Sequence, residues 1–187
     1  MEEAKKNPGE LKLRNVRISF AELFTAKTVN GEGEPAYSAS FILPPDHPQI
    51  AEIKQKIDAV GQAKWANKWP EIKRVMEKAD KTALHDGDLK SYAGYPGNLY
   101  ISARNKSRPA VFDRDRTPLT AEDGRIYSGC FVNANLELWA QDNNYGKRIN
   151  ASLNGVQFFR DGEAFTGGRA SKADDFEDLS QTDDELV

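Results

Sequence analysis

Residues 127–159 read YSGCFVNANLELWAQDNNYGKRINASLNGVQFF, and this stretch carries the clearest structural pattern in the chain. Between residues 127 and 140, apolar and polar side chains alternate with the period of two that is typical of a half-buried β-strand. The predicted inner face consists of Cys130, Val132, Ala134, Leu136 and Leu138. The polar group Asn143-Asn144-Tyr145-Gly146 then predicts a hairpin turn. Residues 148–159 predict the returning strand, with a bulge at Gly155.

Further strands are predicted upstream of this hairpin. In residues 11–20 the apolar positions change phase after Leu13, so we expect a β-bulge near Arg14-Asn15. The new apolar face would hold Val16, Ile18 and Phe20. Residues 36–43 and 98–104 also alternate, whereas residues 28–35 predict a loop. Five or six strands with bulges and glycines predict a mainly β chain, folded as a small closed barrel of the OB type. A β-sandwich is the main alternative on periodicity alone.

A helical block interrupts the strands at about residues 46–80. Apolar side chains recur there at helical spacing, and Asp46, with Gln49 three residues on, has the pattern of a helix N-cap. We expect Trp65 and Trp69 to anchor this block onto the barrel. The predicted organisation is a flexible N-terminus (1–9), an OB-fold domain (10–166) that contains the helical insertion, and a disordered acidic tail (167–187).

The composition excludes several classes of protein. No apolar run approaches the roughly 20 residues that a membrane-spanning helix needs, so no membrane partner is expected. The polar residues 1–9 do not resemble a signal peptide. Cys130 is the only cysteine, which excludes an intrachain disulfide framework and fits a reducing cytosol. With two histidines, His47 and His85, a zinc site of His and Cys ligands is not expected.

Motifs typical of enzymes are also missing. The sequence contains no Gly-rich phosphate loop that ends in Gly-Lys-Ser/Thr and no Gly-x-Ser-x-Gly elbow. Glu137 is the only carboxylate within the two long strands at the C-terminal side, so they offer no acid–base pair. Turn chemistry explains His85, Asp86 and Asp88 better than a metal site does. We therefore predict a protein without catalytic activity and without a cofactor.

Charge is distributed unevenly along the chain. The formal net charge is −3, but residues 173–187 contain seven carboxylates and no Lys or Arg. Without those seven, 26 basic residues face 22 acidic ones, so residues 1–172 carry a formal charge of +4. A basic body with an acidic tail is typical of a polyanion binder whose tail competes for the same surface. The alternative is a solvated tail that only aids solubility. The tail carboxylates are Asp174, Asp175, Glu177, Asp178, Asp183, Asp184 and Glu185.

Cations and aromatic rings are interleaved in the β-rich half of the chain. Residues 100–116 contain five cations and two aspartates, a local formal charge of +3. Cations meet phosphates and aromatic rings stack on bases, which is what sequence-tolerant single-strand binding requires. We expect Tyr100, Phe112, Tyr127 and Phe131 to stack on bases. We expect Arg104, Lys106, Arg108, Arg116, Lys147 and Arg148 to meet phosphates. The alternative is that Tyr127 and Phe131 pack beneath the helical block.

Several short stretches resemble the bacteriophage single-stranded DNA-binding proteins with an OB fold and an acidic tail. They are the opening strand VRISFAELF (16–24), YSASFILP (37–44), YSGCFVNA (127–134), DNNYGK (142–147) and LNGVQF (153–158), followed by DGE (161–163) and the acidic end. The resemblance implies a protein that coats and protects single strands in phage DNA replication and recombination, in the cytoplasm of the bacterial host. It also implies a tail that recruits replication or recombination proteins and dampens DNA binding. Related tails often end on an aromatic residue, whereas this one ends Glu185-Leu186-Val187.

Two other functions remain open from the sequence. One is a strand-annealing recombination factor, which would bind DNA and promote pairing of complementary strands. The other is a protein-interaction β module whose basic face meets an acidic protein. Binding to a single-stranded oligonucleotide separates this last function from the other two.

Overall fold

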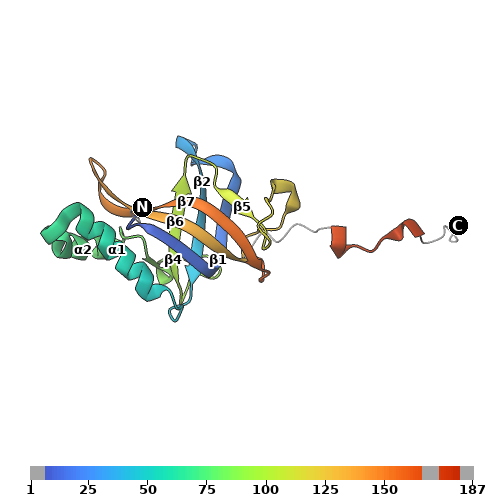
Figure 1. Cartoon of the computed structure of the whole chain (residues 1–187), viewed down its shortest axis with the longest axis horizontal. Coiled ribbons are helices and arrows are strands. Elements are labelled where there is room, and N and C mark those ends of the chain that lie inside the picture. Colours follow the sequence, from blue (N-terminus) through green and yellow to red (C-terminus); the bar gives the residue numbers. More distant parts are fainter. Residues whose placement is uncertain (1–6, 166–172, 182–187) are drawn as a thin grey trace, which may run out of the picture.

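Five strands close into a barrel in the computed structural model, which describes residues 7–165 and 173–181. They are β1 (Glu10–Val29), β2 (Glu32–Leu43), β4 (Leu99–Asn105), β6 (Phe131–Asn143) and β7 (Gly146–Arg160). The strands pair antiparallel in the order β4-β2-β1-β6-β7, and a parallel pairing of β4 with β7 closes the sheet (Figure 1). Two short strands pair with these: β3 (His85–Asp86) pairs antiparallel with β4, and β5 (Ala110–Phe112) pairs parallel with β7. This OB-type barrel is the fold that the sequence predicts.

The barrel interior is apolar, and the strand that the alternation pattern predicts forms part of it. Cys130, Val132, Ala134, Leu136 and Leu138 are all at most 2% exposed. Side chains of β1, β2, β4 and β7 complete the same core. Burial of this kind removes apolar surface from water, and it is the dominant favourable contribution to folding. The predicted inner face of residues 127–140 is therefore confirmed.

The bulge predicted near Arg14-Asn15 is present in β1. The pairing of β1 with β6 shifts register between Leu13 and Val16, and Asn15 has a φ of 53°. A bulged backbone loses ladder partners, so its polar groups need others. Side chains supply two of them: Asn133 Oδ1 accepts from Asn15 N at 3.0 Å, and Gln49 Oε1 accepts from Arg14 N at 2.7 Å.

The predicted position of Phe20 was wrong. Phe20 does not share the buried face of Val16 and Ile18: it has a φ of 50°, lies at a second register shift of β1 between Ser19 and Glu22, and is 52% exposed. A backbone in the left-handed region turns the side chain away from the face that strict alternation assigns to it.

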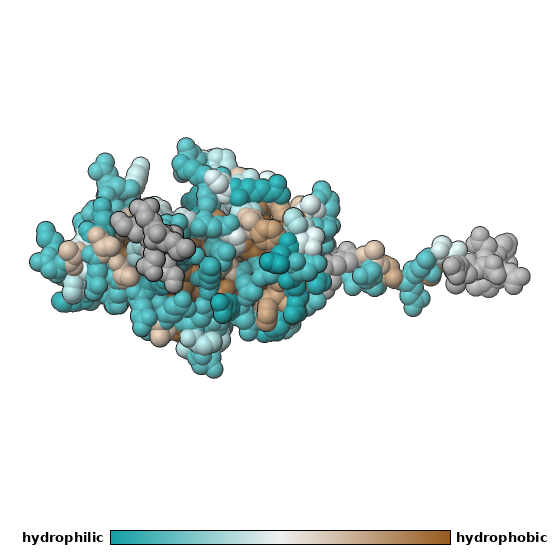
Figure 2. All heavy atoms as spheres, in the orientation of Figure 1, coloured by the Kyte–Doolittle hydropathy of each residue, from teal (hydrophilic) through white to brown (hydrophobic). Residues whose placement is uncertain are grey.

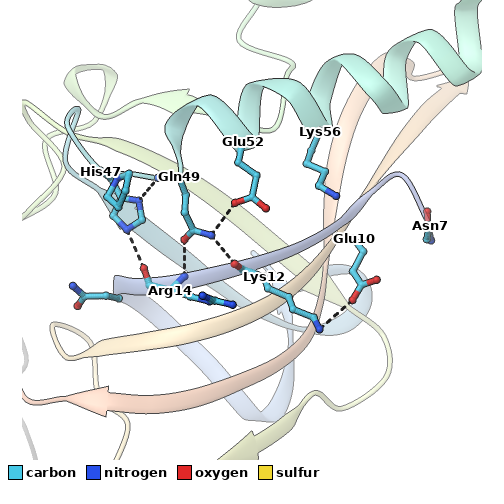
Figure 3. Close-up of a pocket in the computed structure, with 10 residues that line it drawn as sticks. Asn7, Glu10, Lys12, Arg14, His47, Gln49, Glu52 and Lys56 are labelled. Carbon is cyan, nitrogen blue, oxygen red and sulfur yellow. Dashed lines mark hydrogen bonds and ion pairs between the residues drawn. The ribbon is translucent and has the colours of Figure 1, made fainter.

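The helical block consists of α1 (Ile50–Trp65), a 3-10 turn (Ala66–Lys68) and α2 (Trp69–Lys78). The first helix begins at Ile50, so the predicted start at Asp46 was wrong; Gln49 occupies the N-cap position and makes no side-chain capping bond. Its side chain is engaged elsewhere. Besides accepting from Arg14 N, the Gln49 amide donates to Lys12 O at 2.7 Å, and His47 Nε2 lies 2.9 Å from Arg14 O (Figure 3). The start of α1 is thus bonded to the bulged edge of β1.

Two tryptophans join the helices to each other and to the barrel. Trp65 and Trp69 are 8% and 2% exposed, and their rings stack with centroids 5.7 Å apart. Trp65 Nε1 donates to Asp142 Oδ2 at 3.1 Å, next to the turn of the β6–β7 hairpin, while Trp69 Nε1 donates to Asp58 on α1 at 3.0 Å. The anchoring role expected for this pair is confirmed.

Two long hairpins extend from the barrel on the same side (Figure 1). The β6–β7 hairpin closes where Asn143 pairs with Gly146, which confirms the predicted turn, and a register shift next to Gly155 confirms the predicted bulge. The β1–β2 hairpin was predicted as a loop over residues 28–35. Its strands instead continue to Val29 and from Glu32, joined by Asn30-Gly31, both with positive φ. Asn-Gly is the preferred sequence for such a two-residue turn.

The described part of the acidic tail consists of two 3-10 turns, Ala173–Asp175 and Leu179–Gln181. Residues 173–180 are all exposed, including the apolar side chains of Phe176 and Leu179. Residues 166–172 and 182–187, which include Asp183, Asp184 and Glu185, lie outside the described residues. The predicted domain boundaries and the predicted disorder of residues 167–187 therefore stay predictions.

Replacing Gly61 by Ala should destabilise the fold. A Cβ at this position would lie 2.3 Å from Cε2 of Trp69, which is one ring of the stacked tryptophan pair. The extra methyl would improve helix propensity by about 1 kcal/mol, but overpacking a rigid buried contact costs about 1–3 kcal/mol. We expect a lower midpoint of denaturant unfolding.

The control is Gln62→Ala, at the exposed next residue of the same helix, which should change stability by less than about 0.5 kcal/mol. A Gly61→Ala protein as stable as the wild type would mean that the tryptophan pair adapts without cost.

Candidate nucleic-acid interface

A groove of about 1020 Å³ lies between the two long hairpins. Val29, Glu32 and Glu34 line it from the β1–β2 hairpin, and Asn143 and Tyr145 from the β6–β7 hairpin. The segment from Lys81 to Ala83, just after α2, lines a further part of it. The floor is the outer face of the barrel where β4 meets β7.

Small polar side chains make up much of this floor. Ser102 and Arg104 of β4 lie beside Asn150 and Ser152 of β7, and Arg104 pairs with Ser152 across the parallel seam. On the neighbouring β2, Ser40 lies opposite Ser102, and their hydroxyl oxygens are 2.9 Å apart. Short side chains leave room for a ligand to approach the strands, and their hydroxyl and amide groups offer hydrogen bonds to it.

The groove is lined by four cationic side chains and two carboxylates: Lys81, Arg104, Lys106 and Arg148 against Glu32 and Glu34. Lys106 is paired with Glu34, and this hydrogen-bonded ion pair lowers the pKa of the Glu34 carboxyl. Within the described part of the chain, neither Arg104 nor Arg148 has an acidic partner within 4.0 Å. These two guanidinium groups are therefore available to an anionic ligand from outside the chain.

Two exposed aromatic side chains belong to the same groove. Trp139, on the outer face of β6, is 43% exposed, and Tyr145, at the tip of the β6–β7 hairpin, is 87% exposed. The face of the molecule drawn in Figure 2 is mainly hydrophilic, and large rings left in water beside cations are informative. Rings of this kind offer faces for base stacking.

Three of the ten residues predicted to contact DNA line this groove: Arg104, Lys106 and Arg148. A fourth, Lys147, lies beside the groove: its ammonium is 3.5 Å from Asp142, and it lines a smaller apolar hollow along α2. The hydrogen bond from the Trp65 indole lowers the pKa of the Asp142 carboxyl, and Lys147 acts in the same direction.

Tyr100 lies on the outer face of β4, as predicted, but other rings cover it. It is 6% exposed, its ring stacks on His85 with centroids 5.0 Å apart, and Tyr95 packs against it at 4.9 Å. Burial raises the pKa of its hydroxyl, and the nearby Asp80 adds to this shift. His85 in turn lines the groove, so Tyr100 supports one wall of it from behind.

Tyr127 and Phe131 lie near the other end of β6. Trp139 is eight positions after Phe131, which is about 27 Å along a strand. The Tyr127 hydroxyl donates to Asp161 Oδ1 or Gly162 O, both at 2.9 Å, and accepts from Gly162 N at 3.1 Å. Burial raises the pKa of this hydroxyl. The Phe131 ring lies beneath the guanidinium of Arg160, which is 3.6 Å from its centroid.

The remaining predicted residues lie outside the groove lining. Phe112 is half-buried on β5 and pairs with Gln157 of β7. Arg108 lies over the Phe24 ring at 5.5 Å, and Arg116 is exposed in a turn with a φ of 68°. A DNA contact at these positions stays a prediction.

A second hollow, of about 650 Å³, lies between the start of β1 and α1 (Figure 3). Its charged side chains are Glu10, Lys12, Arg14, Glu52 and Lys56, so both signs are present. Glu10 pairs with Lys12 at 3.6 Å, and Gln49 bridges the strand to Glu52. These contacts serve to attach the helix, and none of the described residues that line the hollow has an exposed aromatic ring.

Neither a metal site nor a membrane span is found in residues 7–165 and 173–181. No group of three or more His, Cys, Asp or Glu side chains in those ranges is arranged to hold a metal ion. None of the helices described there is both long enough and apolar enough to cross a membrane.

Trp139 and Tyr145 were not among the site residues predicted from the sequence. The sequence did contain a signal for Trp139. It directly follows Leu138, whose inward position was predicted correctly, so alternation places Trp139 on the outer face of the strand. Tyr145 was visible in the predicted turn. What the alternation pattern could not give is which part of an outer face is covered by other elements of the fold.

Comparison with known proteins agrees with this architecture. The family model described as Enterobacter phage Enc34, ssDNA-binding protein, matches residues 9–187. Putative protein p50 of Acyrthosiphon pisum secondary endosymbiont phage 1 is 50% identical over 179 residues, which are 94% of this chain and 97% of that protein.

Solved structures are similar as well. The single-stranded DNA-binding protein from bacteriophage Enc34 in complex with ssDNA is 30% identical and matches with a TM-score of 0.69, over 83% of this chain and 89% of that one. Gp2.5, a single-stranded DNA-binding protein of bacteriophage T7, has a TM-score of 0.57 at 15% identity, over 94% of this chain and 99% of that one. This second match shows a shared fold. On the match over residues 9–187, the chain belongs to the family of the Enterobacter phage Enc34 ssDNA-binding protein.

Proposed function

We propose that this protein binds single-stranded DNA, largely independently of sequence, during phage DNA replication, and that the strand lies in the groove between the two hairpins. The observation that carries the proposal is the combination, in one groove, of two arginines that have no acidic partner among the described residues with two exposed aromatic rings. The Enc34 protein, a member of the same family, is known in complex with ssDNA. The position of the groove also supports the proposal. OB barrels typically bind oligonucleotides beside the loops that join the first to the second and the fourth to the fifth strand of the barrel. In this chain those connections are the β1–β2 and β6–β7 hairpins, and these two hairpins bound the groove.

The chemistry of the groove favours an unpaired strand. Stacking on Trp139 and Tyr145 requires bases with free faces, which a duplex keeps stacked on one another. Arg104 and Arg148 would hold the phosphates, with Lys81 adding positive charge. Lys106 would join them when its pair with Glu34 opens. Stacking tolerates any sequence because every base has a π-face, so we expect affinity with little sequence preference.

The acidic tail would act on the same groove. Its seven carboxylates are negatively charged, as the phosphates of DNA are. A contact between the tail and the groove of the same molecule would therefore compete with the DNA strand. The exposed Phe176 and Leu179 give the tail apolar contacts with which to recruit replication or recombination proteins. We place this activity in the cytoplasm of the bacterial host, and we infer that the protein binds DNA without catalysing a reaction on it.

Removing a groove arginine should weaken DNA binding and reduce its dependence on salt. For Arg104→Ala and Arg148→Ala, we expect lower affinity for labelled oligo-dT in fluorescence anisotropy. The slope of log affinity against log salt should decrease by about 0.7 for each lost phosphate contact, because fewer counterions are released.

The matched control is Arg74→Ala, which removes an exposed arginine of α2 that does not line the groove. Equal affinity and slope for all three variants and the wild type would contradict the proposed path of the strand.

Two tyrosines should separate stacking from support of the fold. Tyr145→Ala should lower DNA affinity by about 5-fold or more, since stacking contributes about 1–3 kcal/mol per base, and should leave stability unchanged because the ring is in water. Tyr127→Phe should lower stability by about 1–3 kcal/mol through its lost hydrogen bonds, with affinity unchanged.

Both are measured by anisotropy and thermal unfolding of the same preparations. If Tyr127→Phe keeps its stability, and the further change to Ala lowers affinity, the original prediction that Tyr127 stacks on DNA is correct.

Deleting residues 173–187 should tighten DNA binding at low salt. The truncated chain loses seven carboxylates, so its formal charge rises and the competing contact disappears. Anisotropy at several salt concentrations should show a difference that shrinks as salt screens the tail. Identical affinities at low salt would exclude competition, and the tail would then serve solubility or partner binding alone.

A further inference from the structure

We propose that Phe20 and Tyr92 form a second base-stacking platform, which binds nucleotides of the same strand that extend beyond the groove. This inference rests on the proposed function, and it adds a binding site for DNA bases at a different place on the barrel. The two residues come from a bulge in β1 and from the loop before β4, and neither lines the groove.

The two rings are large, exposed and in contact with each other. Phe20 is 52% exposed and Tyr92 50%, and their centroids lie 4.8 Å apart with an interplanar angle of 75°. Phe20 is held outward by a backbone with a φ of 50°, which is rare for a bulky side chain. Backbone strain of this kind persists only where the surrounding structure imposes it, and it concentrates at functional sites.

A buried cluster holds the platform in place. Tyr95, 2% exposed, lies 5.5 Å from the Tyr92 ring and 6.3 Å from the Phe20 ring. Behind it, Tyr100 packs at 4.9 Å from Tyr95 and stacks on His85, a residue of the groove lining. A continuous series of ring contacts therefore connects the exposed platform to the groove wall.

The register of the strands places the platform next to the groove. On the outer face of the barrel, Tyr100, Ser102 and Arg104 follow one another along β4 at spacings of two residues, about 6.6 Å each. Arg104 is in the groove floor and Tyr100 is beneath the aromatic cluster, so the small side chain of Ser102 lies between them. A DNA strand that runs from Arg104 over Ser102 would meet Tyr92 and Phe20 next.

Nothing else in the described fold uses these rings. They do not contribute to the barrel core, whose residues lie on the opposite face of β1 and β2. Exposed aromatics on a buried aromatic support offer π-faces without the entropy cost of ordering a flexible side chain. Nucleic-acid bases are the ligands that match such a surface beside a phosphate-binding groove.

The test compares oligo-dT of two lengths, about 5 and about 12 nucleotides, a short and a long length within the range of about 4–16 nucleotides that OB folds occupy. We expect Phe20→Asn and Tyr92→Ser, singly and together, to keep wild-type affinity for the short oligonucleotide, which the groove accommodates. Affinity for the long one should fall by about 10-fold in the double variant, the loss expected from one or two stacked bases. Asn tolerates the left-handed backbone, so this substitution preserves the bulge.

The control is Leu89→Ser, which removes a 62% exposed apolar side chain shortly before Tyr92 but takes away no ring. It should bind both lengths like the wild type. Long-oligonucleotide affinity that is unchanged in the double variant, with the wild type binding both lengths, would overturn this inference and leave the groove proposal standing. If the wild type binds neither length at low salt, the proposed function itself fails.

Discussion

The rest of the structure depends on the parallel pairing of β4 with β7. The β4–β7 ladder contains one register pair, Arg104 with Ser152. A hydrogen bond of 3.1 Å from the side-chain Nδ2 of Asn105 to Leu153 O supports it. Without this contact, β4 and β7 would both present open edges to water. Further along, β7 pairs with β5 at Gly155–Gln157, so β4 and β5 pair with successive parts of the same edge of β7. Closure of the barrel thus creates a seam, and the outer side of that seam is the groove floor.

The two departures of β1 from regular strand geometry serve different purposes. At Arg14-Asn15 the bulge exposes backbone groups, which His47 and Gln49 satisfy as they attach the first helix to the barrel. At Phe20 the irregularity turns a large ring outward, toward Tyr92. One strand therefore bends to close the barrel, receives the helical block and presents an aromatic surface, all through local changes in register.

The sequence was sufficient for the fold and for part of the candidate site. Alternation in residues 127–140 predicted the core face correctly, because period-two patterns report burial directly. The predicted start of α1 was wrong. The Gln49 side chain hydrogen-bonds to β1 instead of to its own helix, and a local capping rule does not include such a tertiary contact. For the site, cation-rich segments pointed to Arg104, Lys106 and Arg148. Exposure decided the rest: Tyr100 and Trp139 both lie on outer faces, but only the fold places other rings over Tyr100 and leaves Trp139 in water.

The unequal environments of the three tryptophans have an optical consequence. Trp65 and Trp69 are buried and stacked on each other, whereas Trp139 is 43% exposed in the groove. The intrinsic emission of the native protein is therefore a sum of two signals with different origins. The stacked pair reports the seating of the helices on the β6–β7 hairpin, through the bond from Trp65 to Asp142. Trp139 reports the solvent in the groove, so a spectroscopist who replaces it by Phe obtains a folding probe that is blind to that groove.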